Sequence, residues 1–461
     1  MVRLIANNGR AILVILLVIS VVMCYKAPAV YDFSYCLVCF VIFLISAVVL
    51  LVNNTNKYKT IILFEFLFTL SFFFVNYAYP VFIYPTSTSY FSLFLYSFNE
   101  DVISRATAVA TLGFCSYSTF QYENRNFSNS KIEYKDRYSR VSTVEVFFLF
   151  ILFLVYFIQV YTYLSGNLSY SEGAGFFRIL AIFLLFKRLY NHNIHHPLIR
   201  DIALWGIIAA YIVINLLVGN RGDPLYVAMA AFVSYTLFVH RIPARVFMPV
   251  VVAGLLVFFI VGQIRTGAND VGDNGSMISR VKDVQIDEND AGALLIAKEL
   301  IINNRSLYVL MDYSDKNGLD YGYSWQLSIY SIVPFLQSFM IELFNISKEK
   351  AASVNLTTYL EFGRDNPDAF GMGTNLIGDI YICFGTVGII IFMSLFGRII
   401  RNAYRKMRHS SASALLYVCF FVFSVYYPRA MYLEPIRLIV WSFILYQLTF
   451  RKQNSIKCIK Q

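Results

Sequence analysis

Charged side chains are scarce in this sequence. Asp, Glu, Lys and Arg make up 14% of its 461 residues and apolar residues 58%, whereas soluble domains are roughly 45–50% apolar. The mean hydropathy is +0.60, and apolar runs long enough to cross a bilayer recur along the whole chain. A soluble globular domain is therefore excluded. We expect an all-α polytopic integral membrane protein with about 12 transmembrane helices and one large outer loop.

The apolar runs set the expected order of spans. Nine spans should fall in residues 1–264, and three more, followed by a cytoplasmic tail, in residues 371–461. Between them, residues 265–370 are mostly polar and should form the large periplasmic or extracellular loop. The expected spans lie near 11–27, 35–52, 60–83, 103–121, 142–164, 174–190, 201–219, 224–240, 247–264, 372–396, 411–427 and 436–450.

Lysine and arginine, which accumulate on the cytoplasmic face, indicate the sidedness. With the N-terminus inside, the inner connections hold 23 of these residues and the short outer connections 6, so both termini should be cytoplasmic. Within the large loop the run from Leu327 to Phe344 is almost apolar enough to span. Pro334, Gln337 and Glu342 interrupt it, and a further span would move the Arg398–Arg408 cluster outside. This run should therefore be an interfacial or re-entrant helix on the membrane.

Other absences narrow the chemistry. The five histidines all lie in short basic connections expected inside, which excludes a histidine base or histidine-bound metal on the outer side. No phosphate-binding P-loop and no nucleotide-binding domain are visible, so neither a cofactor nor a metal is expected. The run Asp287–Asp290 is better explained as solvated than as a cation site. The net charge of +10 lies in the membrane connections and does not indicate nucleic acid.

Polar groups at the outer ends of spans are the candidates for function. Arg221 lies in an outer turn beside a helix N-terminus, where it could hold a phosphate or anchor a lipid headgroup. Arg265 begins the large loop and could equally be a snorkelling arginine. Arg364, Asp365 and Asp368 precede a Gly-x-Gly turn, and this cluster could also be a solvated loop.

The sequence after that loop carries a resemblance. Gly371-Met-Gly-Thr-Asn-Leu-Ile-Gly-Asp379 is followed by Tyr381 and by Phe384-Gly385-Thr-Val-Gly388. This order resembles the Wzy-type O-antigen polymerases, which show a Gly-x-Gly turn, an acid with a tyrosine two positions later, and Phe-Gly-x-x-Gly at the start of a late helix. About eighteen residues carry the match, and the expected architecture resembles the family over the whole chain. Asp379 also lies in the first turns of a helix, where the helix dipole favours a carboxylate.

The resemblance implies a membrane glycosyltransferase on the outer face of the bacterial inner membrane. It would polymerise undecaprenyl-diphosphate-linked oligosaccharide repeat units, with membrane lipids and a chain-length regulator as further partners. Arg221, Arg265 and Arg364 are then expected to bind the diphosphate, and Asp365, Asp368 or Asp379 to act as the base. The alternatives are a flippase for lipid-linked oligosaccharides and an O-antigen ligase. Ligases are known for an outward-facing histidine, which is missing here.

Overall fold

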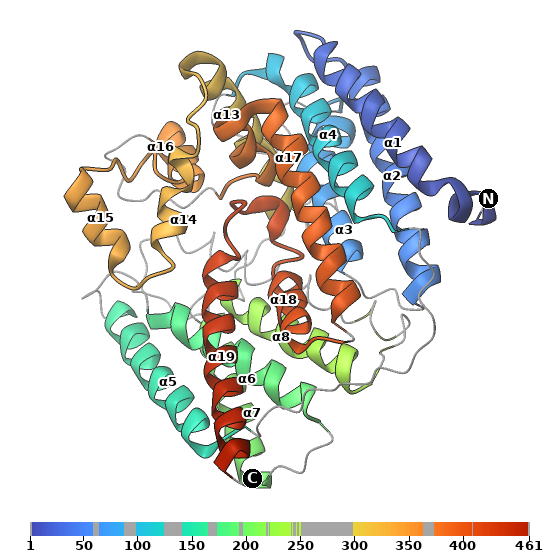
Figure 1. The fold of residues 1–461 in the computed structure, drawn as a ribbon. Coiled ribbons are helices and arrows are strands. Elements are labelled where there is room, and N and C mark those ends of the chain that lie inside the picture. Colours follow the sequence, from blue (N-terminus) through green and yellow to red (C-terminus); the bar gives the residue numbers. More distant parts are fainter. Residues whose placement is uncertain are drawn as a thin grey trace. The chain divides into compact units, whose positions relative to one another are not determined.

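In the computed structural model, every regular element of the described residues is a helix (Figure 1). The structure describes the chain except for residues 1, 59–63, 87–97, 124–140, 165–172, 193–196, 218–219, 221, 241, 243–245, 247–248, 250–297, 363–372, 408 and 460–461. The helical fold class expected from the sequence is thus confirmed.

Helices occupy the expected spans wherever the structure describes them. The expected span at residues 247–264 lies outside the described residues except for residue 249. The matching helices are α1 (Val2–Tyr25), α2 (Phe33–Tyr58), α3 (Phe64–Asn76), α4 (Ile103–Gln121), α5 (Thr143–Leu164), α6 (Gly173–Tyr190), α7 (Leu198–Leu217), α8 (Gly222–Phe238), α17 (Leu376–Lys406), α18 (Ser411–Val422) and α19 (Ile436–Ile459).

Within the described residues, five helices are long and apolar enough to cross a membrane: α1, α2, α5, α7 and α17. Shorter apolar helices are α3, α18 and the Ile436–Thr449 part of α19. The polytopic membrane class follows from these helices. The number of twelve spans stays a prediction.

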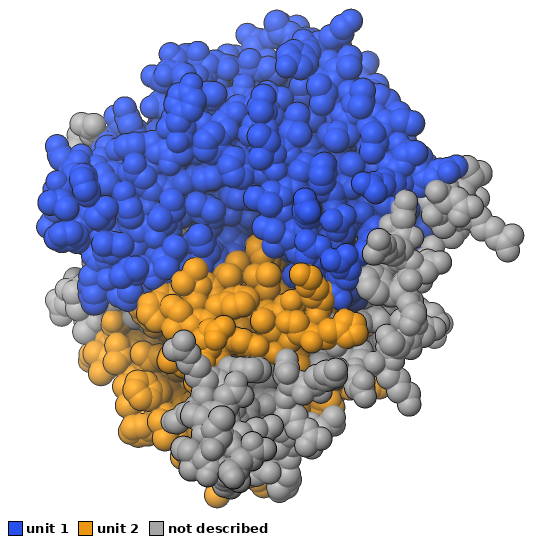
Figure 2. All heavy atoms as spheres, in the orientation of Figure 1, with its two compact units in different colours: residues 1–131, 297–405, 424–437 blue, residues 132–296, 406–423, 438–461 orange. Residues whose placement is uncertain are grey.

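The chain forms two compact units, coloured separately in Figure 2. Unit 1 comprises residues 1–131, 297–405 and 424–437, and so contains α1–α4, α17 and the described part of the large loop. Unit 2 comprises residues 132–296, 406–423 and 438–461, with α5–α8, α18 and most of α19. The expected division at residues 264 and 370 refers to sides of a membrane and stays a prediction.

Aromatic rings fill the core of unit 1 between α2, α3 and α4. Phe43 stacks on Tyr77 with ring centroids 4.5 Å apart, and meets Phe114 edge to face at 4.6 Å. Close helix packing comes from glycine, since a Cβ on Gly397 of α17 would lie 2.4 Å from the Tyr117 carbonyl oxygen of α4. Small residues allow this approach of helix backbones in membrane proteins.

The helix ends of unit 1 sort into two groups. At the "loop end", where the large loop packs, Tyr31 donates to the Pro80 carbonyl at 2.9 Å and Arg105 pairs with Asp315. At the "opposite end", Gln121 donates to Glu65 at 2.5 Å and Arg405 lies 3.7 Å from Glu123. Segments that the charge count assigned to one side therefore share one end in space. Which end faces the cytoplasm stays a prediction.

The large loop is folded where it is described. It holds α12 (Lys298–Ile301), α13 (Asn304–Asn317), a 3-10 turn (Tyr323–Trp325), α14 (Gln326–Tyr330), α15 (Leu336–Phe344) and α16 (Ser353–Phe362). The run Leu327–Phe344 is divided between α14 and α15. Neither piece is long enough to cross a bilayer, which requires about 20 residues.

Gly385 interrupts α17. Its φ of 61° and ψ of −157° are open to glycine but not to residues with a Cβ. The break frees two carbonyl oxygens of α17, and these accept from the large loop: Asp320 N donates to Ile382 O at 2.9 Å, and Tyr321 N to Cys383 O at 3.1 Å. Gly385 of the sequence motif therefore provides a docking point for the loop.

Candidate active site

Asp379 is fully buried in the first turns of α17, with 0% of its surface exposed. Its Oδ1 accepts from Ser353 Oγ at 2.5 Å, and its Oδ2 from Trp325 Nε1 at 2.9 Å and Tyr432 N at 2.8 Å. These donors come from α16, the 3-10 turn before α14, and the connection before α19. The carboxylate thus joins three segments to the start of α17.

Asparagines make the neighbouring contacts. Asn375 precedes α17, and its Oδ1 accepts from the N–H groups of Ile377 and Gly378 at 2.9 and 3.3 Å. Its Nδ2 donates to Asn76 Oδ1, at the end of α3, at 3.1 Å. In α13, Asn304 Nδ2 donates to the Val75 carbonyl at 2.9 Å. These side chains satisfy backbone groups that helix ends leave open.

Gly373, the second glycine of the Gly-x-Gly motif, contacts α16 and Asn303. Its φ is +73°, and its carbonyl accepts from Thr357 Oγ1 of α16 at 2.7 Å. A Cβ on Gly373 would lie 2.5 Å from Asn303 Oδ1 and 3.7 Å from an Arg429 guanidinium nitrogen. The positive φ therefore favours glycine, and a Cβ here would displace the Asn303 side chain.

A buried ion pair joins α13 to α16. Arg305 Nε lies 2.9 Å from Glu361 Oε1, and the two side chains are 1% and 4% exposed. Burial raises the pKa of Glu361, while the Arg305 charge acts in the opposite direction. No described group bonds the second Glu361 oxygen, Oε2, which is also buried. The pair lies in the large loop, outside the membrane-spanning segments.

Arg429 is the arginine that the structure adds at this end. It lies in a 3-10 turn (Tyr427–Arg429), half-buried, with its guanidinium carbon 5.4 Å from the centroid of the Tyr426 ring. Its guanidinium also approaches Gly373. We name Asn303, Arg305, Glu361, Gly373 and Arg429 the "loop-end cluster". The sequence contained these residues, but spacing along the chain gives no sign of the Arg305–Glu361 pair or of the approach of Gly373 to Asn303 and Arg429.

Of the six residues expected to form the site, the structure describes Asp379 alone. Arg221, Arg265, Arg364, Asp365 and Asp368 lie outside the described residues. Arg364, Asp365 and Asp368 belong to the segment 363–372. On one side of this segment Glu361 pairs with Arg305, and on the other side Gly373 accepts a hydrogen bond from Thr357. The chain thus enters and leaves this segment at the loop-end cluster.

In unit 2 the structure describes the residues around position 221. Asp223, in the first turn of α8, accepts from Arg178 Nη1 at 2.5 Å and from Asn220 Nδ2 at 3.2 Å. Arg178 of α6 also lies 5.0 Å from the centroid of the Tyr226 ring. Asp223 therefore holds an arginine as well as occupying a favourable position for a carboxylate at a helix start.

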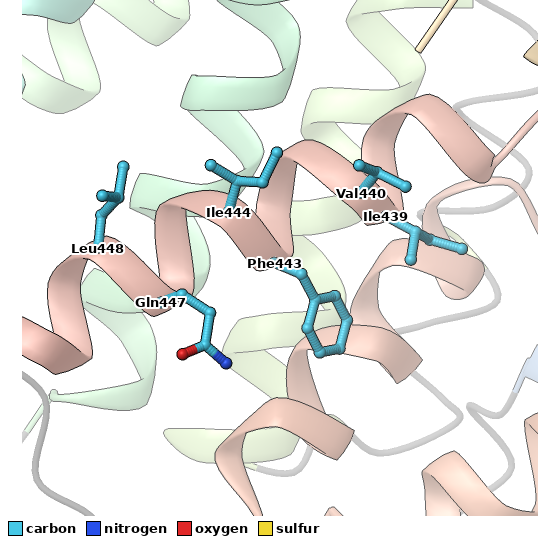
Figure 3. A pocket seen from close by; sticks show the side chains of 6 residues that line it. All are labelled: Ile439, Val440, Phe443, Ile444, Gln447 and Leu448. Carbon is cyan, nitrogen blue, oxygen red and sulfur yellow. The ribbon is translucent and has the colours of Figure 1, made fainter. Parts of the chain in front are cut away.

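A shallow groove of about 500 Å³ runs along α19 in unit 2. Figure 3 shows its side chains in two rows along the helix, with Val440, Ile444 and Leu448 in one row and the other three in the second. They are Ile439, Val440, Phe443, Ile444, Gln447 and Leu448. Because only Gln447 is polar and no lining residue is charged, the groove suits hydrocarbon. Elsewhere, the described residues contain no group of three or more His, Cys, Asp or Glu that could hold a metal.

The sequence matches the family model described as O-antigen polysaccharide polymerase Wzy over residues 10–451, nearly the whole chain. The chain belongs to this family. Wzy proteins are polytopic membrane polymerases of polysaccharide synthesis, which agrees with the apolar helices of both units. No curated protein and no solved structure matches the chain.

Proposed function

We propose that this Wzy protein polymerises oligosaccharide repeat units carried on undecaprenyl diphosphate, at the outer face of the bacterial inner membrane. The observation that carries the proposal is the family match over residues 10–451. The folded polar loop at one end of the membrane helices supports it, because both substrates carry water-soluble sugars on a membrane-bound tail.

The reaction joins two lipid-linked substrates. A hydroxyl of the incoming repeat unit attacks the anomeric carbon of the growing glycan. The bond from that carbon to the diphosphate oxygen breaks, undecaprenyl diphosphate leaves, and the hydroxyl proton passes to a carboxylate base. The charge that develops on the leaving diphosphate is best stabilised by arginine, which can form two parallel hydrogen bonds to phosphate.

We assign the diphosphate contacts to Arg221, Arg265 and Arg364. Arg429 is a further arginine for this role, since it lies at the loop-end cluster beside Gly373. In unit 2, Arg178 pairs with Asp223 and is therefore not assigned this role.

For the base we propose Asp365 or Asp368. The third candidate, Asp379, accepts three hydrogen bonds in a buried site. The carboxylate is fully buried, so a substrate hydroxyl cannot reach it without displacing these contacts. These contacts support a positioning role for Asp379, which holds the large loop on α17.

Deletion of the gene tests the reaction. A polymerase acts after a repeat unit has crossed the membrane and before transfer to the final acceptor, so the deletion strain should display single repeat units on its surface. The variants Asp365→Asn and Asp368→Asn should be tested for the same pattern at normal protein level, with Lys316→Ala, at an exposed position, as the control. A surface without repeats would indicate a flippase, and long chains left on undecaprenyl diphosphate would indicate a ligase; either result overturns the proposal.

A further inference from the structure

The α15 helix has an unusual environment for a segment of a folded loop. None of its nine residues is buried. Left-handed backbone conformations bound it on both sides, with φ of 64° at Phe335 and 48° at Asn345. At 1.5 Å per residue it is about 14 Å long, less than half of the hydrocarbon thickness of a bilayer.

One side of α15 faces unit 1. Ile341 packs against the cluster of Leu327, Ala351 and Ala352, and Ile346, just after the helix, joins the same cluster. Helical periodicity places Phe339 and Leu343 on the side that points away from Ile341. The helix is therefore attached along one side and open along the other.

The open side is apolar. Phe335, Phe339 and Leu343 follow each other at intervals of four residues and are 80%, 58% and 59% exposed. Phe344 and Val333 are exposed as well. The polar residues Ser338 and Glu342 are also exposed, and the helical spacing sets them on a different side. An exposed face of this kind marks an interaction site.

The attachment of this segment indicates what covers the face. Trp325, directly before α14, packs on Phe384 and Phe392 of α17 with ring centroids 5.3 and 5.0 Å apart. Beyond its break at Gly385, α17 exposes Val387, Ile391 and Leu395, the apolar stripe that a membrane-spanning helix presents to lipid. The α14–α15 segment is thus joined to α17 where that stripe begins. Figure 1 shows α15 at the edge of this part of the chain.

We propose that α15 docks on the lipid bilayer surface at the loop end, with Phe335, Phe339 and Leu343 among the acyl chains and Ser338 and Glu342 toward water. Apolar area on one side and polar residues on another are the features that hold a helix in the plane of a membrane interface. The exposed Lys348 and Lys350, which follow the helix, can reach phosphate headgroups.

Docking would fix the depth of the candidate site. Ser353, which donates to Asp379, begins α16 eight residues after the Asn345 that ends α15. If the proposed function holds, α15 keeps the loop-end cluster at the level of the lipid headgroups, where the diphosphate of a lipid-linked sugar lies. The docking itself does not depend on that function.

Spin labels on the full-length protein in nanodiscs of phosphatidylethanolamine and phosphatidylglycerol test the proposal. Single cysteines would replace Phe339, Leu343, Ser338 and Glu342 in a background where Cys24 and Cys458 are serine. These positions are exposed, so labelling leaves the packing of unit 1 intact. Collision of the label with oxygen, which concentrates in lipid, is compared with collision with a water-soluble nickel chelate. Val387 serves as the lipid reference and Lys316 as the water reference.

We expect labels at 339 and 343 to match the Val387 reference, and labels at 338 and 342 to match the Lys316 reference. Equal access of the nickel chelate to all four sites would place the helix in water. Shielding of 339 and 343 from both reagents would mean that protein covers the face. Either outcome overturns the docking. Polymer formation by the same variants is read separately, so failure of the proposed function is distinguishable.

Discussion

The Arg305–Glu361 pair allows the sharpest test of how the large loop is held. With side chains 1% and 4% exposed, both charges are removed from water. Replacing Arg305 by leucine leaves the carboxylate buried without its partner. Loss of one member of a buried pair costs about 3–5 kcal/mol, whereas loss of an exposed pair costs less than about 1 kcal/mol. We therefore expect Arg305→Leu to lower the free energy for opening of the α13–α16 region by about 3–5 kcal/mol.

The double variant Arg305→Leu/Glu361→Leu removes both charges. Replacing a buried pair by apolar residues is often neutral or stabilising, so the double variant should regain most of the opening free energy. A polytopic protein does not unfold in one step, and native-state proteolysis between residues 304 and 361 is the suitable measurement. When opening and closing are fast, the cleavage rate reports the population of the open form.

Two results would refute this reasoning. A cost below about 1 kcal/mol for Arg305→Leu would show that the pair behaves as a surface ion pair. Costs that simply add in the double variant would show that the two side chains do not interact. We regard the pair as a structural link. Polymer formation should therefore fall with protease resistance in Arg305→Leu and recover with it in the double variant. A resistant double variant that makes no polymer would assign the pair a chemical role.

Four further predictions concern the same end of unit 1 and the arginines. Burial raises the pKa of Glu361, so protonation of this carboxyl stabilises the folded loop at a pH below its ordinary pKa of about 4.3. This stabilisation is lost as the pH rises through the raised pKa. Proteolysis at several pH values should show this change in the opening free energy, and Glu361→Gln should remove it. Gly373→Ala should abolish polymer at normal protein level, because its Cβ would meet Asn303 and its φ is positive. Gels of surface polysaccharide measure the polymer. Gly206→Ala, where a Cβ meets nothing within 4 Å, is the matched control. Asp379→Asn should retain polymer formation. Asp379→Leu leaves three buried donors unpaired, at about 1–3 kcal/mol each, and its large loop should become sensitive to protease. Loss of polymer in a stable Asp379→Asn protein would instead make Asp379 the base. At Arg221, Arg265 and Arg364, replacement by alanine should abolish polymer. Replacement by lysine should retain part of it, since a point charge lacks the paired donors of arginine.

The sequence predicted the helices well because a membrane-spanning helix is a local property. An apolar run is visible in about 20 consecutive residues, and it located α2, α4 and α5 to within a few residues except at the C-terminal end of α2. The interruption of the run Leu327–Phe344 was also visible, since Pro334 cannot continue a helix without losing a hydrogen bond. Lysine and arginine counts grouped the helix ends of unit 1 in the way that the contacts now show.

The loop-end cluster was not predictable in this way. Arg305 and Glu361 are 56 residues apart in the numbering, and no periodicity connects them. Asp379 was recognised from the family motif, but its three donors come from segments that the motif does not contain. The motif glycine Gly385 opens α17 to accept two backbone N–H groups from the large loop, a role that its place in the motif does not show. Such roles depend on tertiary contacts.

The contacts at the loop end explain how a polar loop can be folded on apolar helices. A helix end leaves backbone N–H or C=O groups unpaired, and leaving them so in a dry environment is costly. Here the ends pair with each other: Asn304 binds the end of α3, and Asn375 binds Asn76 while capping α17. The loop is therefore attached in part through hydrogen bonds that the membrane helices need satisfied in any case. The segment 363–372, which holds the proposed diphosphate-binding Arg364 and the two candidate bases, is joined on both sides to this cross-linked region. Fixed supports of this kind are what a site requires to hold two large substrates in a reactive geometry.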